Sequence, residues 1–169
     1  FGMRRGGRAY YALDITDPSS PELAWKISPS QICAGAACAS SSDYAELGQA
    51  WSTPVVGTIR GYMDTNIFSK YRPVLVFGGG YDPNQDLETP VNDTMGRAIF
   101  VIDAETGDLI RKFDSSDSSQ MVYSIPSDVL ALDTTGDAGQ TIDRVYVGDM
   151  GGNLWRLDLD DRSTANSPS

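Results

Sequence analysis

The sequence contains no histidine among its 169 residues, and this absence excludes several kinds of site. A Ser-His-Asp triad and a Cys-His dyad both need an imidazole as their general base. Zinc and iron sites with imidazole ligands are excluded for the same reason, and two cysteines are too few for a four-thiolate zinc site. None of these chemistries can arise from this chain alone.

Basic side chains are also scarce. Lysine and arginine number 13 against 23 aspartates and glutamates, which gives a formal net charge of −10. Nucleic-acid binders carry a basic face, and anionic lipid attracts basic segments, so we expect no nucleic-acid partner and no attraction to an anionic membrane. The charge is compatible with cation binding. Because 40% of the residues are hydrophobic, a folded globular chain is expected.

Long hydrophobic runs are missing as well. The run "VLVF" at 74–77 is far shorter than a membrane span, so no membrane insertion is expected. No signal peptide is recognisable. The chain opens on "FGMRRGGRAYYALD", which has the character of the interior of a longer protein, so the missing leader says little about the compartment.

The only two cysteines, Cys33 and Cys38, lie in the segment "CAGAAC", which we expect to be a loop of small residues. They could close a short disulfide if the protein is exported, or remain two free thiols.

The pattern that is present is a succession of short β-type runs bounded by Gly, Pro, Asp or Asn, with almost no helical periodicity. We expect strands near residues 8–15, 22–27, 53–59, 72–79, 97–103, 108–113, 127–132, 143–149 and 153–159. Two hairpins are predicted, one turning at Glu105 to Gly107 and one at Gly151–Gly152. Gly107 is suited to a positive φ.

The runs repeat at a spacing of about 70 residues. "STPVVGTI" is matched by "SIPSDVLAL", "RPVLVFGGGYD" by "DRVYVGDMGG", and "GRAIFVIDAETGDLI" is echoed by "GRAYYALDITDP" and "GNLWRLDL". Units of four antiparallel strands that bury their faces against neighbouring units are typical of a β-propeller.

The sequence therefore predicts an all-β fold of antiparallel β-propeller blades, and an incomplete one. It holds about nine strands, or roughly two and a quarter blades of a larger propeller: the last two strands of one blade, four of the next and three of a third. We expect residues 1–160 to form this partial propeller and residues 161–169 to be a disordered tail. Because exposed sheet edges pair readily, a swapped or edge-paired oligomer is also expected.

Five stretches resemble the C-terminal propeller domain of the PilC/PilY family of type IV pilus biogenesis factors and tip adhesins. They are "GMRRGGRAYYALDITDP", "LGQAWSTPVVGTI", "RPVLVFGGGYDPNQD", "GRAIFVIDAETGDLI" and "DRVYVGDMGGNLWRLDL". They occur in the family's order and together span most of residues 2–159, which makes the set more specific than any one stretch.

This resemblance implies a role that composition could not show. The protein would be exported to the cell surface, the pilus tip or the outer membrane. It would support pilus extension, twitching motility and adhesion, with pilins, minor pilins and host-surface receptors as partners, and it would not be an enzyme.

The resemblance also implies a calcium loop just before the strand "DRVYVGD". Asp133, Thr135 and Asp137 match the first three positions of the family's pattern, and the closing acid, Asp143, comes late because of a two-residue insertion. Ca²⁺ takes six to eight oxygens, so these side chains and a backbone carbonyl close to Thr141 form a suitable donor set.

This loop is not a complete EF-hand, because Arg144 stands where the bidentate Glu would be. Weak to intermediate affinity is therefore expected, with a Kd of about 10⁻⁵ to 10⁻³ M. The alternative is an Asx-rich turn without an ion. A second stretch, "YDPNQDLE" at 81–88, has similar spacing but is better interpreted as an exposed loop between strands.

Two other functions remain open. A pyrroloquinoline-quinone dehydrogenase fragment would share the "ALD…W" repeat, although the adjacent cysteines of those enzymes are absent. A metal-free propeller scaffold would only dock partners.

Other conspicuous residues have structural interpretations. The tryptophans are expected to pack between blades, the "GGG" at 78–80 to allow close backbone approach, and Arg4, Arg5 and Arg8 to form a solvated or inter-blade cluster.

Overall fold

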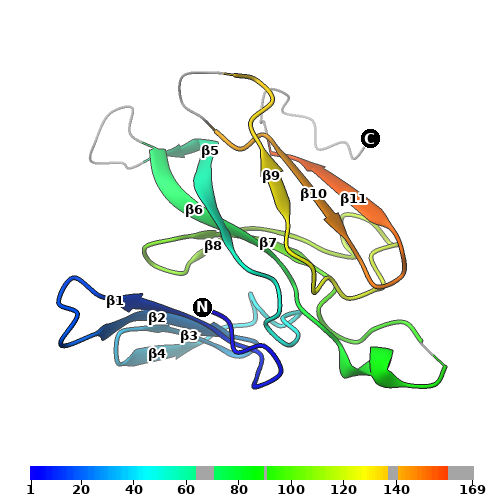
Figure 1. Ribbon diagram of the computed structural model, residues 1–169, viewed down its shortest axis with the longest axis horizontal. Coiled ribbons are helices and arrows are strands. Elements are labelled where there is room, and N and C mark those ends of the chain that lie inside the picture. Colours follow the sequence, from blue (N-terminus) through cyan, green and yellow to red (C-terminus); the bar gives the residue numbers. More distant parts are fainter. Residues whose placement is uncertain (64–70, 90, 137–140, 160–169) are drawn as a thin grey trace.

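The computed structural model describes residues 1–63, 71–89, 91–136 and 141–159 (Figure 1). The described elements are eleven β-strands and a short 3₁₀ helix, η1 (Pro83–Asp86). The strands are β1 (Tyr10–Asp14), β2 (Glu22–Ser28), β3 (Gln31–Ala34), β4 (Ala37–Ser40), β5 (Val55–Met63), β6 (Tyr71–Gly78), β7 (Ile99–Asp103), β8 (Leu109–Phe113), β9 (Leu130–Leu132), β10 (Arg144–Gly148) and β11 (Leu154–Asp158). No helix in these ranges is long and apolar enough to cross a membrane.

The strands form three antiparallel meanders, in the orders β1-β2-β3-β4, β5-β6-β7-β8 and β9-β10-β11. This confirms the predicted all-β fold of propeller blades. Both predicted hairpins are present: β7 pairs with β8 and β10 with β11. Gly107 and Gly152 have positive φ angles of 75° and 84° in their turns.

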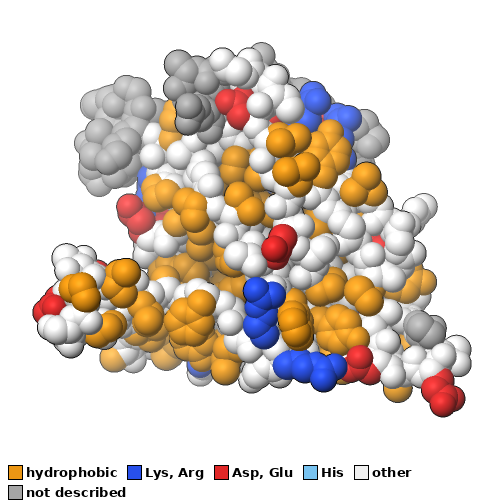
Figure 2. Space-filling model, viewed as in Figure 1, with side chains coloured by type: hydrophobic (Ala, Val, Ile, Leu, Met, Phe, Trp, Pro, Cys, Tyr) orange, Lys and Arg blue, Asp and Glu red, His pale blue; other side chains and the backbone are white. Residues whose placement is uncertain are grey.

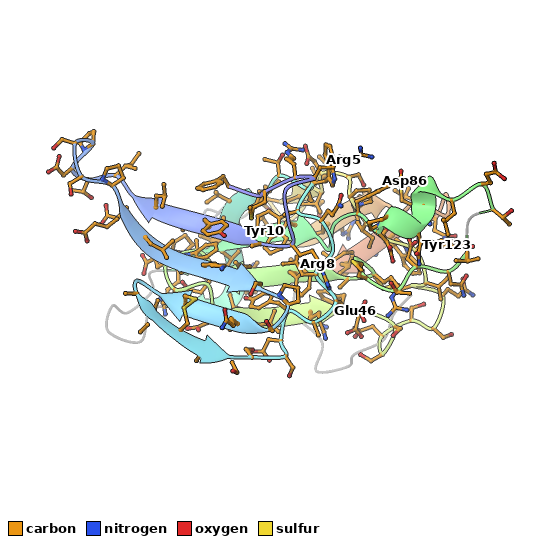
Figure 3. All side chains as sticks on the ribbon, turned by 90° about the horizontal axis from the view of Figure 1, so that it is seen from below. Arg5, Arg8, Tyr10, Glu46, Asp86 and Tyr123 are labelled. Carbon is orange, nitrogen blue, oxygen red and sulfur yellow. A yellow bond between two sulfur atoms is a disulfide. The ribbon has the colours of Figure 1, made fainter. Side chains whose placement is uncertain are left out.

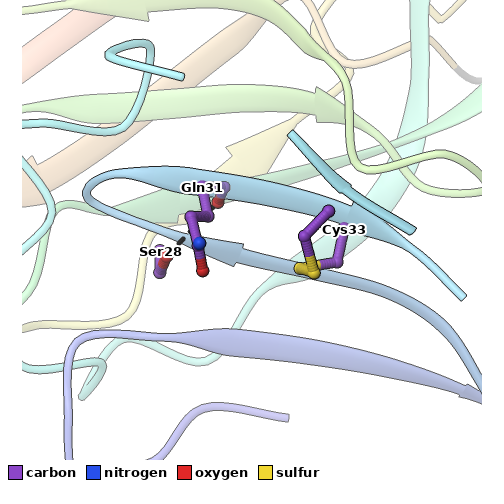
Figure 4. Close-up of a disulfide and its surroundings, with 4 residues drawn as sticks. Ser28, Gln31 and Cys33 are labelled. Carbon is purple, nitrogen blue, oxygen red and sulfur yellow. Dashed lines mark hydrogen bonds between the residues drawn. A yellow bond between two sulfur atoms is a disulfide. The ribbon is translucent and has the colours of Figure 1, made fainter. Parts of the chain in front are cut away.

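The predicted number of strands is too low, because the segment expected to be a small-residue loop forms the hairpin β3–β4. Cys33 and Cys38 lie directly opposite each other in this hairpin and are joined by a disulfide, with sulfur atoms 2.18 Å apart (Figure 4). Small residues carry little β-type patterning, so the sequence did not reveal strands that backbone pairing with β2 and the disulfide hold in place.

The repeat shows how this extra hairpin fits the first blade. Phe1 and Gly2 pair with the start of β1 as Phe77 and Gly78 pair with the start of β7. β1 and β2 therefore occupy the third and fourth strand positions of their blade, as predicted from the sequence. The β3–β4 hairpin extends the blade outward beyond the fourth position.

The hydrophobic core lies on both faces of the middle sheet. β7 is buried along its whole length, because one face packs toward the first sheet and the other toward the third. The cluster toward the first sheet comprises Tyr10, Trp25, Ile27, Tyr44, Leu47, Ala50, Phe77, Ala98, Phe100 and Ile102. The other includes Val74, Val76, Ile99, Val101, Ile125, Ile142, Val145, Val147 and Leu157. Both faces of the middle blade are thus covered by neighbouring blades.

Two of the tryptophans confirm the expected inter-blade packing. Trp25 is buried and donates from its indole nitrogen to the Ala104 carbonyl at 2.9 Å, which joins β2 to the β7–β8 turn. Trp155 is partly buried and packs against the cluster between the second and third sheets.

The glycines at 78–80 lie where backbones from separate repeats meet. A Cβ atom on Gly78 would lie 2.4 Å from the Ile125 carbonyl oxygen, and one on Gly80 would lie 2.2 Å from that of Gln49. The expected close backbone approach is confirmed.

The connections fall at two opposite ends of the strands. The β6–β7 and β10–β11 connections, and the segments that lead into β5 and β9, lie at one end. The β9–β10 connection, which contains the acidic loop, lies at the other end, at the top of Figure 1.

Candidate metal-binding loop

The acidic loop joins β9 to β10 and contains four of the five predicted ligands within the described residues: Asp133, Thr135, Thr141 and Asp143. Asp137 lies outside the described residues, as do 138–140. The expected tail, 161–169, is also outside them.

Asp133 begins the loop as an exposed Asx turn. Its Oδ1 atom accepts hydrogen bonds from the Thr135 amide at 3.0 Å, the Thr135 hydroxyl at 2.9 Å and the Gly136 amide at 3.1 Å. Thr135 and Asp133, predicted to bind the same ion, are thus in direct contact.

Asp143 ends the loop and is only 6% exposed. Its carboxylate accepts from the Thr134 amide at 2.8 Å and from the Thr134 hydroxyl at 2.5 Å. Its backbone is fixed at both sides, because its amide donates to the Leu132 carbonyl and its carbonyl accepts from the Leu159 amide. The two ends of the acidic loop are therefore held together.

Two opposing effects act on the pKa of Asp143. Burial raises it, but the hydrogen bonds from Thr134 and the charge of Arg144 outweigh burial, and the pKa of Asp143 lies below its usual value. The Asp143 carboxylate is consequently ionised at neutral pH, as a calcium ligand must be.

Thr141 is buried and connects the loop to the neighbouring blade. It forms a parallel bridge with Thr58 of β5, and the next amide, that of Ile142, donates to the Thr58 carbonyl at 2.7 Å. The Ile142 side chain packs over Gly57, where a Cβ would lie 2.4 Å from the Ile142 Cδ1 atom. The end of the acidic loop is thus part of the contact between the second and third sheets.

The chemistry of the donor set fits a hard cation such as Ca²⁺, because every predicted ligand atom is an oxygen. Among residues 1–136 and 141–159, apart from the gaps at 64–70 and 90, no three acidic side chains gather as a metal-binding group.

Thr134, which the sequence reasoning did not single out, is the residue that closes the loop onto Asp143. Its position next to Asp133 in an Asx-type segment was the available signal.

The second acidic stretch lies between β6 and β7 and is largely exposed, as predicted, but its first acidic residue is buried. Asp82 is 1% exposed and caps η1 by accepting from the Asn84 amide. Its other carboxylate oxygen accepts from the Thr94 amide and hydroxyl and from the Met95 amide, at 2.6, 3.0 and 3.1 Å. Asp82 holds the long β6–β7 connection together, whereas Asp86 remains exposed.

The chain is similar to known proteins along its whole length. The family model of the PilY1 beta-propeller domain matches residues 1–169. The type IV pilus biogenesis factor PilY1 of Pseudomonas aeruginosa strain PAO1 is 31% identical over 157 residues, which are 93% of this chain and 11% of that protein. The PilY1 homolog of Xylella fastidiosa is 29% identical over 170 residues, covering 94% of this chain and 9% of that protein.

A solved structure shares the fold. The crystal structure of the Pseudomonas aeruginosa PilY1 C-terminal domain matches with a TM-score of 0.64 and 26% identity, over 94% of this chain and 26% of that one. The chain spans about a tenth of the length of the curated relatives it matches. Their names describe pilus biogenesis factors and not enzymes. The repeats are thus of the predicted PilC/PilY type, and this chain belongs to the PilY1 β-propeller domain family.

Proposed function

We propose that this chain is a calcium-binding β-propeller portion of a surface-exposed type IV pilus protein, which supports pilus extension, twitching motility and adhesion by binding rather than by catalysis. The names of its relatives support the link to pilus biogenesis. The missing histidine supports a binding role over the common hydrolytic chemistries. Pilins or minor pilins at the cell surface or pilus tip, and host-surface receptors, are the partners that we propose.

The observation that carries the calcium proposal is the closure of the acidic loop by Asp143. This carboxylate is buried, ionised and fixed by its backbone, and it lies beside the start of the same loop through Thr134. Asp133, Asp137 and Asp143 would supply carboxylate oxygens, Thr135 its hydroxyl and Thr141 its carbonyl. A bound Ca²⁺ supplies the positive charge that offsets repulsion among the three carboxylates.

The contact with β5 connects the acidic loop to the middle blade. Thr141 is the parallel bridge partner of Thr58, and the Ile142 amide donates to the Thr58 carbonyl, so ordering of the loop would stabilise the junction of the second and third sheets. The effect on a partner is limited by the difference in calcium affinity between the two loop states.

Calorimetric titration with CaCl₂ tests this proposal. We expect saturable binding to the wild-type chain, with Asp133→Ala and Asp137→Ala each weakening the affinity at least tenfold. Asp17→Ala is the matched control, because Asp17 also accepts bonds in an exposed Asx turn but lies in the β1–β2 connection. Its isotherm should match that of the wild type.

A metal-free scaffold is the second candidate function. It is favoured by the hydrogen bonds within the loop, because Thr134 bonds both carboxylate oxygens of Asp143, and Thr135 bonds Oδ1 of Asp133, without an ion. Two results would favour the metal-free scaffold over the calcium-binding function. The isotherms of the wild type and both loop variants would be identical, and millimolar calcium would leave the melting temperature unchanged.

A further inference from the structure

An open groove of about 650 Å³ lies at the end of the strands opposite the acidic loop. Connections from three successive blades form it, since Arg5 precedes β1, Tyr81 follows β6 and Met150 follows β10. The segments that lead into β5 and β9 supply the rest of the lining: Trp51, Pro126 and Ser127. Binding sites commonly occur where loops from several rigid elements meet in this way.

The lining of the groove is mainly apolar, and its aromatic wall is held in place. The indole nitrogen of Trp51 donates to the Gln49 side chain at 3.3 Å, and the Arg4 guanidinium lies 5.6 Å from the centre of the Trp51 ring. The Ser127 hydroxyl donates to the Gly148 carbonyl at 2.7 Å, so this polar group is already bonded. A fixed, largely apolar wall is suited to a bulky apolar side chain.

The rim of the groove carries charges of both signs: the arginines Arg4 and Arg5, with the carboxylates of Asp86 and Asp128 beside them. Arg4 is anchored by a 2.6 Å bond to the Trp51 carbonyl. Arg5 has a side chain that is 72% exposed and reaches the carboxylate of Asp86 at 3.5 Å. Figure 2 shows basic side chains (blue), with acidic ones (red) next to them, beside apolar surface (orange) in the lower middle of the face in view, and Figure 3 places Arg5 near Asp86.

The contact between Arg5 and Asp86 is a weak one. Both side chains are exposed, and Asp86 has a shorter bond of 2.7 Å from the Tyr81 hydroxyl. Exposed ion pairs contribute little to stability, and a guanidinium has five donors. Arg5 can therefore take up a second carboxylate without loss of a strong interaction.

We propose that this groove binds a segment of a partner protein that presents a large apolar side chain next to a carboxylate. The apolar side chain packs against Trp51 and Tyr81, and the carboxylate pairs with Arg5 at the rim. The site uses no residue of the acidic loop, so it goes beyond the calcium proposal and does not depend on it.

Two probes that differ only in charge test the site. We expect N-acetyl-L-tryptophan, titrated into the isotopically labelled chain, to shift the indole N–H resonance of Trp51 saturably. N-acetyl-L-tryptophanamide has the same ring without the carboxylate, and we expect its Kd to be at least threefold higher.

Surface variants test whether the carboxylate of the acid probe pairs with Arg5. Arg5→Gln should abolish the difference between the two probes, and Asp86→Asn should strengthen the acid probe by removing a competing carboxylate. Arg156→Gln is the control, because Arg156 pairs with Asp158 on β11 and does not line the groove. Asp133→Ala should leave both titrations unchanged, which separates this test from that of calcium binding.

Three results would overturn the proposal. These are equal affinity for both probes in the wild-type chain, saturation with shifts only at residues outside the groove, and a preference for the acid that persists in Arg5→Gln. Saturation by methyl α-D-glucopyranoside without any response to N-acetyl-L-tryptophan would assign the groove to carbohydrate and would overturn it as well.

Discussion

The guanidinium of Arg72 on β6 lies 2.7 Å from the carboxylate of Asp103, whose side chain is fully buried at the end of β7. The same carboxylate accepts from the amides of Glu105 and Thr106 at 2.7 and 2.9 Å. One buried carboxylate thus connects the second strand of the middle blade to the turn between its third and fourth strands.

Loss of this carboxylate should be strongly destabilising. We expect Asp103→Ala to lower the free energy of unfolding by about 3–5 kcal/mol, because the substitution removes a buried carboxylate that is the acceptor for two backbone amides and the nearest partner of a partly buried guanidinium. Asp108→Ala, in the same turn but exposed, should cost less than about 1 kcal/mol. Urea unfolding followed by circular dichroism measures both, and equal losses would contradict this account.

The chain should lose stability in acid, in part through Asp82. Burial raises the pKa of Asp82, but the hydrogen bonds from Asn84, Thr94 and Met95 outweigh burial and lower it. The unfolded chain therefore binds a proton more readily than the folded chain, and the stabilisation is present above about pH 4 and lost as the pH falls through the lowered pKa. In urea titrations at a series of pH values, Asp82→Asn should flatten this loss; parallel profiles would show that Asp82 does not contribute.

Close backbone approach at Gly80 should make this position intolerant of a side chain. Gly80 has a φ of 103°, and a Cβ there would lie 2.2 Å from the Gln49 carbonyl oxygen. Gly152 also has a positive φ, but a Cβ there would meet nothing within 4 Å. We expect Gly152→Ala to cost about 1 kcal/mol, from backbone strain alone, and Gly80→Ala to cost several times more. Similar melting temperatures for the two variants would show that the clash with the Gln49 carbonyl does not destabilise the Gly80 variant.

The disulfide should stabilise the outer hairpin without affecting the acidic loop. Cross-linking so short a loop contributes about 2 kcal/mol by the chain-entropy relation. The double substitution Cys33→Ala, Cys38→Ala should lower the free energy of unfolding by about that amount and leave calcium affinity unchanged. Thermal unfolding with calorimetric titration checks both, and a change in calcium affinity would show an unexpected coupling between the first and third blades.

Much of the fold was predictable because propeller blades repeat. The equivalence of Pro54 and Pro126, and of Gly78 and Gly148, located the strands of the second and third blades. The β3–β4 hairpin was missed because it has no counterpart among the described residues of the other repeats, and because its small residues lack the alternation that indicates a strand.

The candidate site was predictable only as a set of residue types. The spacing of Asp133, Thr135 and Asp143 drew attention to the loop, but it could not show that Asp143 is buried against Thr134. For Asp82 as well, the sequence did not reveal that the side chain is buried. Its segment was interpreted as an exposed loop, whereas the burial of Asp82 depends on Thr94 and Met95, which are distant in the sequence. Long-range hydrogen bonds of this kind leave no local pattern.

A crystal structure of the chain grown in millimolar CaCl₂ tests the calcium proposal most directly. The account predicts a density peak at the β9–β10 connection with six to eight oxygens at about 2.3–2.6 Å, including carboxylates of Asp133, Asp137 and Asp143. A well-ordered loop in which these oxygens bind only water, or only the Thr134 and Thr135 donors, would contradict it.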